Sequence, residues 1–259
     1  MRFACISLVA LFSISGCDKP SSDAVPPQTE GTHDAQPDAD EAHGGHEHGE
    51  HGHGPNAEHD GHGHGHHRFE NAEEWAKHFD SPERDAWQKP NAVVAFLSLK
   101  PGDIVADLGA GTGYFAVKIA PEVPQGRVLA NDIEPDMVRY LGERAEKDGL
   151  GNIVPVQGSA AGPELPEAVD VAFMCDVYHH IDDRPAYFAK VRDQLKSGGR
   201  LVIVDFRKDA ADDAPGPPPA MRIAAKDLIA ELEGAGWKHV RTDAETLPHQ
   251  YIVELVPAT

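Results

Sequence analysis

Three glycines at alternate positions form the segment of this chain best suited to bind a ligand. Gly109, Gly111 and Gly113 follow the apolar run 103–108 and precede a helical pattern at 114–120. Glycine adopts positive φ angles and lets a ligand approach the backbone closely, and the first N–H groups of a helix attract anionic groups. The segment therefore predicts a strand, a tight turn and a helix start that bind a nucleotide-type ligand.

Other polar side chains that could take part in chemistry lie at the ends of apolar runs elsewhere in the chain. They are Asp107, Asp132, Ser159, Asp176, His179 and His180. His179 and His180 could act as a general base or, with Asp176, hold a metal ion. The alternative is that both histidines only pack against or cap the helix that follows. The sequence pattern leaves both interpretations open.

The elements that must position these residues alternate along the second part of the chain. Predicted strands span residues 104–108, 127–132, 153–157, 169–175, 200–206, 239–246 and 250–256. Predicted helices span residues 135–147, 184–195 and 224–234. Strands separated by helices indicate a parallel sheet covered on both faces, with ligands at the carboxyl ends of its strands. We predict an α/β fold with a doubly wound, mostly parallel seven-stranded sheet and a C-terminal antiparallel hairpin.

The overall charge excludes one class of partner. The 259 residues include 43 acidic and 23 basic side chains, which gives a formal net charge of −20. A phosphate backbone requires a basic protein surface, so nucleic-acid binding is not expected. The positions of Cys5, Cys17 and Cys175 offer no disulfide framework.

The first residues are typical of an export signal. Arg2 and the apolar run 3–14 fit a cleaved signal peptide, because that run is shorter than the roughly 20 residues that span a bilayer. The segment Ile14-Ser15-Gly16-Cys17 resembles the bacterial lipobox. The resemblance implies acylation of Cys17 and lipid anchoring to a bacterial membrane, facing the periplasm or exterior. The alternative is an ordinary signal peptide with an incidental cysteine.

A polar tract separates this signal from the apolar part of the chain. Residues 17–67 are rich in Pro, Gly, Ser, Asp, Glu and His, which predicts a disordered tether. Imidazoles on a flexible chain can wrap around zinc, copper or nickel without a fixed site. The candidate ligands are His46, His48, His51, His53, His62, His64 and His66. The alternative is a hydrophilic spacer that binds no metal.

The pattern from Asp107 to Gly113 resembles motif I of the class I S-adenosylmethionine-dependent methyltransferases. It departs from the dinucleotide fingerprint G-x-G-x-x-G, because its third glycine comes one residue early and Tyr114 follows. Segments 175–181, 195–204 and 234–237 resemble further parts of this family. The resemblance covers roughly residues 90–259 and is nearest to small-molecule methyltransferases of the ubiquinone-biosynthesis type. It implies a Rossmann-like methyltransferase fold.

The same resemblance assigns a cofactor and its contacts. It implies that S-adenosylmethionine is bound by Asp107, Gly109, Gly111, Gly113, Asp132, Ser159 and Asp176. Asp107 would approach the amino group and Asp132 the ribose hydroxyls. Ser159 stands where the family commonly has an acid that meets adenine. Methyl transfer then requires mainly alignment of the acceptor with the methyl group, so a dedicated base is optional.

We therefore expect four segments. Residues 1–16 form the signal peptide, 17–67 the tether, 68–100 an N-terminal helical lid and 101–259 the methyltransferase domain. The lid aromatics Trp75, Phe79 and Trp87 either cover the ligand crevice or pack against the edge of the sheet. The methyl acceptor is expected to be a small molecule, whose identity and the oligomeric state the sequence leaves open.

Two other functions remain alternatives at this point. One is a non-catalytic metal- or ligand-binding lipoprotein that reuses the fold, since an exported protein has no evident supply of the cofactor. The other is a nicotinamide oxidoreductase, which the glycine spacing disfavours.

Overall fold

The computed structural model describes residues 71–259. Cys17 lies outside the described residues, and so do the candidate metal ligands His46, His48, His51, His53, His62, His64 and His66. Within the described part, no helix is both long enough and apolar enough to cross a membrane.

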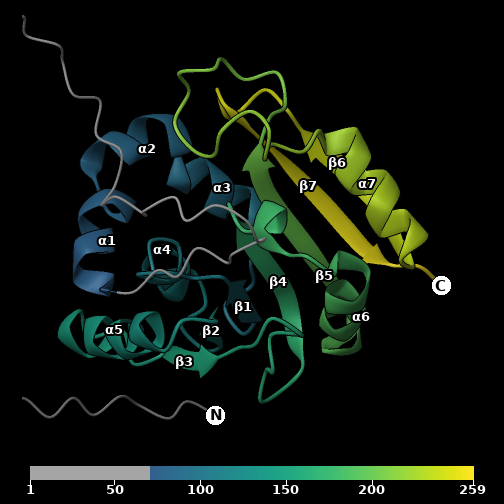
Figure 1. Cartoon of the computed structure of the whole chain (residues 1–259). Coiled ribbons are helices and arrows are strands. Elements are labelled where there is room, and N and C mark those ends of the chain that lie inside the picture. Colours follow the sequence, from purple (N-terminus) through teal and green to yellow (C-terminus); the bar gives the residue numbers. More distant parts are fainter. Residues whose placement is uncertain (1–70) are drawn as a thin grey trace, which may run out of the picture. The chain divides into compact units, whose positions relative to one another are not determined.

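Seven strands form one sheet in the order β3-β2-β1-β4-β5-β7-β6 (Figure 1). The strands are β1 Ile104–Leu108, β2 Arg127–Asp132, β3 Ile153–Gln157, β4 Val169–Cys175, β5 Leu195–Phe206, β6 Trp237–Asp243 and β7 Gln250–Pro257. The first five are mutually parallel, and β7 is antiparallel to both β5 and β6. This confirms the predicted mostly parallel sheet with an antiparallel C-terminal hairpin. The strand order reverses between β1 and β4, which is where ligands bind in such folds.

Helices cover both faces of the sheet (Figure 1). They are α1 Ala72–Phe79, α2 Pro82–Gln88, α3 Pro90–Leu97, α4 Ala116–Ile119, α5 Pro135–Lys147, α6 Arg184–Asp193 and α7 Ala225–Gly234, with short 3-10 turns η1 Ala120–Glu122 and η2 Tyr178–His180. One apolar cluster packs Val93 and Ile119 against the sheet, and the other packs Phe188 and Leu228 against its opposite face. The protein therefore has a hydrophobic core on each face of the sheet, and the central strands β1 and β4 are buried between the two.

The start of β5 differs from the prediction. The sequence predicts a helix over residues 184–195, with the pair Gly198-Gly199 as its stop signal, and a strand that begins at Arg200. Instead α6 ends at Asp193, and β5 begins at Leu195 and contains both glycines. The pairing of β4 with β5 shifts register there, and Gly198 has a φ of 78°. A glycine in the left-handed region thus forms an irregularity within a strand, where we had expected a helix stop.

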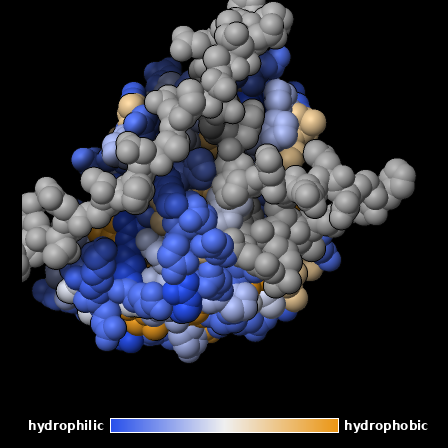
Figure 2. All heavy atoms as spheres, turned by 60° about the vertical axis from the view of Figure 1, so that its left-hand side comes forward, coloured by the Kyte–Doolittle hydropathy of each residue, from blue (hydrophilic) through white to orange (hydrophobic). Residues whose placement is uncertain are grey.

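The first helix, α1, is attached to α5 at both of its ends. The N–H of Ala72 donates to Oδ2 of Asp136 at 2.7 Å, and Nη1 of Arg144 donates to Oδ2 of Asp80 at 2.8 Å. On the outside, Arg139 bridges Glu73 and a further carboxylate on α5. Figure 2 turns this side of the molecule forward, and the coloured surface there is mostly hydrophilic. The inner face of α1 and α2 is therefore directed toward the glycine turn.

Candidate functional site

The glycine turn joins β1 to α4 at the carboxyl end of the sheet. Its three glycines have φ angles of 72°, 55° and 90°, which glycine adopts without strain. The N–H of Gly109 donates to the carbonyl of Asn131 at 2.8 Å. The N–H of Gly111 donates to Oδ2 of Asp132, also at 2.8 Å. Hydrogen bonds at two points therefore fasten the turn to the end of β2.

Asp132 is a structural part of this turn. Its Oδ1 accepts from the N–H of Glu134 at 2.9 Å, while its Oδ2 holds Gly111. Burial raises the pKa of Asp132, and the two N–H donors oppose that shift. Each carboxylate oxygen has a second lone pair, so the side chain can still accept from the hydroxyl of a ligand.

Asp107 is a buried carboxyl group with an unsatisfied oxygen. The residue is 3% exposed, and its Oδ2 has no hydrogen-bond partner. Burial raises the pKa of Asp107 to about 7, the nearby Asp132 carboxylate adds to the shift, and Arg84 opposes it. Buried polar atoms are nearly always paired, so an orphaned oxygen beside a glycine turn points to a missing cationic or hydrogen-bonding ligand.

Asp176 follows β4 and lies close to the same turn. It has a φ of 61°, a backbone conformation that costs free energy in a residue other than glycine and is frequent at functional sites. The next residue, Val177, lies against the turn, because a Cβ added to Gly109 would be 2.4 Å from its Cγ2. Burial raises the pKa of Asp176 to about 6, and Arg84 counteracts this shift. Its Oδ1 accepts from the side-chain amide of Gln250.

Arg84 supplies the positive charge among these carboxyl groups. Its guanidinium lies 4.0 Å from the ring centroid of Tyr114 and 3.5 Å from Oδ2 of Asp176. Its Nη1 also donates to the carbonyl of Phe79 at 3.1 Å. We did not predict Arg84 from the sequence, since nothing in α2 indicates that one arginine lies between carboxyl groups of β1 and β4.

The lid aromatics divide between the two expected positions. Phe79 lies over the turn, because a Cβ on Gly111 would be 3.4 Å from its ring, and Trp75 stacks on Phe79 with ring centroids 5.4 Å apart. Trp87 instead packs against Phe206 at the end of β5, at 5.7 Å. A ligand that approaches Gly111 on the side of its missing Cβ therefore meets the ring of Phe79.

Ser159 hydrogen-bonds within its own loop after β3. Its hydroxyl donates to the carbonyl of Gly162 and accepts from the N–H of Ala161, at 3.3 and 3.2 Å. These bonds close a small turn, and none of them reaches the glycine turn. The structure therefore brings Asp107, Asp132 and Asp176 to the glycines, whereas the described contacts of Ser159 are local.

The structure distinguishes the two histidines. His179 has a side chain that is 3% exposed, and its Nδ1 lies 3.0 Å from Oδ1 of Asp205. His180 is exposed, with its ring centroid 4.2 Å from that of His179. Asp205 was missed, although a lone acid within an apolar strand was a visible signal. Across residues 71–259 no group of three or more His, Cys, Asp or Glu side chains could hold a metal ion.

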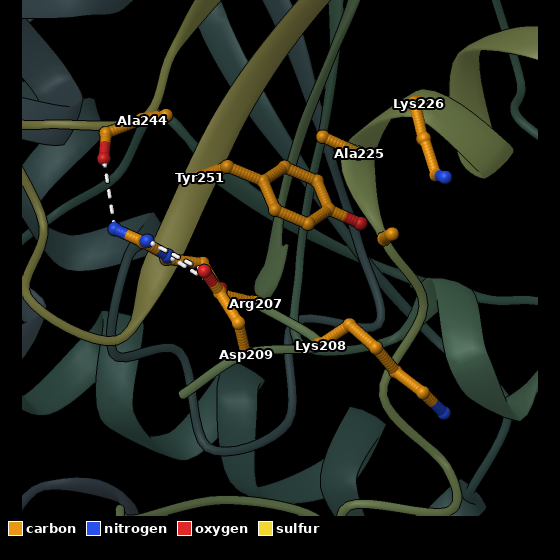
Figure 3. Close-up of a pocket in the computed structure, with 8 residues that line it drawn as sticks. Arg207, Lys208, Asp209, Ala225, Lys226, Ala244 and Tyr251 are labelled. Atoms are coloured by element: carbon orange, nitrogen blue, oxygen red, sulfur yellow. Dashed lines mark hydrogen bonds and ion pairs between the residues drawn. The ribbon is translucent and has the colours of Figure 1, made fainter. Parts of the chain in front are cut away.

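A cavity lies beyond the end of β5 (Figure 3). This cavity of about 360 Å³ is lined by Arg207, Lys208, Asp209, Ala224, Ala225, Lys226, Ala244 and Tyr251. Within it Arg207 is paired with Asp209 at 3.0 Å and donates to the carbonyl of Ala244 (Figure 3). It contains none of the predicted cofactor residues, but it opens at the carboxyl end of β5, on the edge of the sheet that carries the glycine turn.

Comparison with known proteins supports a methyltransferase fold. Residues 105–199 match the family model of a methyltransferase domain. The chain is 32% identical over 173 residues to the ubiquinone/menaquinone biosynthesis C-methyltransferase of Francisella philomiragia, which covers 66% of this chain and 65% of that protein. It is 30% identical over 156 residues to the arsenite methyltransferase of Halobacterium salinarum, covering 56% of this chain and 40% of that protein. The chain thus spans less than two thirds of either relative.

A solved structure agrees with this result. The crystal structure of an S-adenosylmethionine-dependent methyltransferase from Aquifex aeolicus superimposes with a TM-score of 0.66 at 27% sequence identity. The match covers 71% of this chain and 97% of that protein. The shared region therefore includes nearly the whole of a solved protein.

We predict that Asp107→Asn stabilises the ligand-free protein increasingly as pH rises from 5 to 8. The folded-state pKa of Asp107, about 7, lies above its ordinary value, so ionisation at rising pH costs folding free energy in the wild type. The neutral amide avoids this cost, which reaches at most about 4 kcal/mol at about 1.4 kcal/mol per pKa unit. Urea unfolding at several pH values measures the difference.

Asp170→Asn is the matched control. The pKa of Asp170 is lowered, because hydrogen bonds from the N–H of Ile104 and from Lys196 outweigh its burial. Its carboxylate is therefore ionised in both states throughout this pH range, and its substitution should destabilise by a constant amount. A pH-independent effect of Asp107→Asn would contradict a raised pKa for Asp107 in the folded protein.

Proposed function

We propose that this chain is a class I S-adenosylmethionine-dependent methyltransferase that transfers a methyl group from S-adenosylmethionine to a small-molecule acceptor. The observation that carries this proposal is the glycine turn with the orphaned carboxyl oxygen of Asp107 beside it. When bound, the cofactor supplies an electrophilic methyl group on a positively charged sulfur.

The residues at the turn fit this cofactor. S-adenosylmethionine carries an amino group and a sulfonium, both cationic, and the site offers the buried carboxyl group of Asp107 and the partly buried one of Asp176. Asp107 accepts a hydrogen bond from the amino group with the oxygen that otherwise has no partner. Asp132 keeps the turn in place and accepts from the ribose hydroxyls with its remaining lone pairs.

The leading helices control access to this site. Phe79 covers Gly111, and Arg84 neutralises the carboxyl groups that the cofactor requires. The bound cofactor would contact these two side chains of α1–α2, and the helices would shield the reaction from water. Exclusion of water strengthens the electrostatic interactions that align the reacting groups.

The acceptor approaches from the carboxyl end of β5. The similar enzymes are named for arsenite and for ubiquinone and menaquinone biosynthesis, and these acceptors differ in chemistry. The cavity that Tyr251 lines, next to the loop after β5, offers room for a small molecule (Figure 3).

We further propose that the enzyme is a bacterial lipoprotein. The lipobox-like segment that ends at Cys17 supports acylation and anchoring of the protein in the cell envelope, facing the periplasm or exterior. The tract 18–67 then forms a tether that binds divalent metal ions with low specificity.

S-adenosylmethionine should bind the purified chain with micromolar affinity, and Asp132→Ala should weaken binding by at least about tenfold. The substitution removes the hydrogen bond to Gly111, and a bond to a charged group contributes about 1.5–3 kcal/mol. Isothermal titration calorimetry measures both proteins. Asp193→Ala, an exposed acid at the end of α6, is the control and should bind as the wild type does. Failure of a folded wild type to bind favours the non-catalytic alternative.

Cells that express the protein should incorporate radiolabelled palmitate into it, and Cys17→Ser should abolish the label because the acyl acceptor is lost. Cys5→Ser serves as the control, since Cys5 lies within the segment expected to be removed. Undiminished labelling of the Cys17→Ser protein would refute lipid anchoring through this residue.

A peptide that spans residues 18–67 should bind zinc or copper with micromolar affinity in calorimetry. The matched peptide carries Gln at all eleven histidines of this span, the seven candidate ligands included, and should not bind, because the amide is a poor ligand for these ions. Millimolar or absent binding by the natural peptide leaves the hydrophilic spacer as the function of the tract.

A further inference from the structure

Four side chains beside the glycine turn form a closed ring of hydrogen bonds. Nε and Nη2 of Arg84 donate to Oε1 of Gln88 at 3.2 and 3.1 Å, and Nη2 also reaches Oδ2 of Asp176 at 3.5 Å. Nε2 of Gln88 donates to Oε1 of Gln250 at 2.5 Å, and Nε2 of Gln250 donates to Oδ1 of Asp176. The ring therefore connects α2 with β7 and with the residue that follows β4.

The two charged members fix the direction of this ring. A guanidinium only donates and an ionised carboxylate only accepts, so each amide accepts on the side of Arg84 and donates on the side of Asp176. Gln88 and Gln250 are fully buried, and each amide oxygen and nitrogen has a partner in the ring. Two buried amides with one allowed orientation thus hold a cation and an anion opposite each other.

The direct contact between the two charges is the longest in the ring. Charged groups usually form hydrogen bonds of about 2.7–2.9 Å, whereas Arg84 and Asp176 are 3.5 Å apart. Arg84 also has partners that do not depend on Asp176. Its guanidinium lies 4.0 Å from the ring centroid of Tyr114, and its Nη1 donates to the carbonyl of Phe79 at 3.1 Å. Arg84 can therefore release Asp176 and keep its other contacts.

Asp107 and Asp176 offer a ligand two different kinds of carboxyl group. Oδ2 of Asp107 has no partner that a ligand would have to replace, whereas both oxygens of Asp176 are bonded, one of them to a cation. S-adenosylmethionine and its product S-adenosylhomocysteine share the amino group, but only the cofactor carries a positive charge on sulfur. The charge that persists matches the unpaired carboxyl group, and the charge that disappears matches the carboxyl group that has a cation of its own.

We propose that Arg84 and Asp176 form an exchangeable ion pair by which the site responds to the charge on the sulfur of its ligand. This inference rests on the proposed function. With the cofactor bound, Asp176 contacts the positive sulfur, and Arg84 keeps its contacts with Tyr114 and Phe79. With the product bound, Arg84 pairs with Asp176 again. Asp176 thus gives the preference for the cofactor, and Arg84 limits that preference because it competes for the same carboxylate.

The reaction itself produces the change that this pair detects. The acceptor atom forms a bond to the methyl carbon and releases its proton to water. The electron pair of the methyl–sulfur bond remains on sulfur, which becomes neutral. Arg84 and Asp176 are therefore specificity-determining residues, and Gln88 and Gln250 are positioning residues that align the two charges.

Calorimetry of the full chain with each of the two ligands tests this inference at pH 8, where Asp176, with a pKa of about 6, is ionised. The measured quantity is the dissociation constant of the product divided by that of the cofactor. Arg84→Met removes the competing charge and should raise this ratio about tenfold, within the usual range of coupling between sites. Asp176→Asn should lower it about tenfold, because the positive sulfur then meets Arg84 without a carboxylate. A loosened lid would weaken both ligands equally and leave the ratio unchanged.

Two further variants separate charge from structure. Arg84→Lys retains the positive charge and should keep the ratio close to that of the wild type. Arg241→Met is the matched control, because it removes a charge of the same sign from an ion pair with Glu254 that joins β6 to β7. It should leave the ratio unchanged.

Nitrogen-15 NMR observes the exchange directly. The Nε–H signal of Arg84, identified by its loss in Arg84→Met, should shift when S-adenosylmethionine is added and stay near its ligand-free position with S-adenosylhomocysteine. Equal shifts with both ligands, or an unchanged ratio of dissociation constants in Arg84→Met and Asp176→Asn, would overturn this inference alone. A folded wild type that binds no S-adenosylmethionine overturns the proposed function instead.

Discussion

The hydrogen bond from Gly111 to the Asp132 carboxylate is the contact on which the candidate site depends. It fixes a turn with three left-handed backbone conformations to the end of the neighbouring strand, at the place where the strand order reverses. Because the turn is held there, Asp107 ends inside the protein and Val177 can lie against Gly109. A side chain at Gly109 would collide with Val177, so the local backbone and the ligand site impose the same requirement.

The second property of the site is an excess of buried negative charge. Asp107, Asp132 and Asp176 all have raised pKa values through burial, and the charge of Arg84 opposes the shift at Asp107 and Asp176. Ionised groups without partners destabilise a folded protein, so the ligand-free state gives up stability here. A cationic ligand recovers that free energy on binding. Arg84 and the ligand compete for the same carboxyl groups. Cofactor affinity is therefore coupled to movement of the Arg84 side chain on α2 away from Asp176.

Much of the fold could be predicted from local patterns. The bounds of α5 agree with the prediction because Pro135 starts an amphipathic run, and β1 agrees because apolar residues end abruptly in glycine. The start of β5 was wrong, since two adjacent glycines are compatible with either a helix stop or a strand irregularity. Arg84 and Asp205 were missed because their roles arise from contacts with residues remote in the chain: Arg84 is 92 positions from Asp176, and Asp205 is 26 positions from His179.

The reversed direction of β7 sets the order in which the site can form. Antiparallel pairing brings the first residues of β7 to the same edge as the carboxyl ends of the parallel strands, so Gln250 reaches Asp176 and Tyr251 lies beside Asp205. The strand also fills the space between β5 and β6, both of which are synthesised earlier. The site therefore remains incomplete in a growing chain until β7 has been synthesised and has paired with β5.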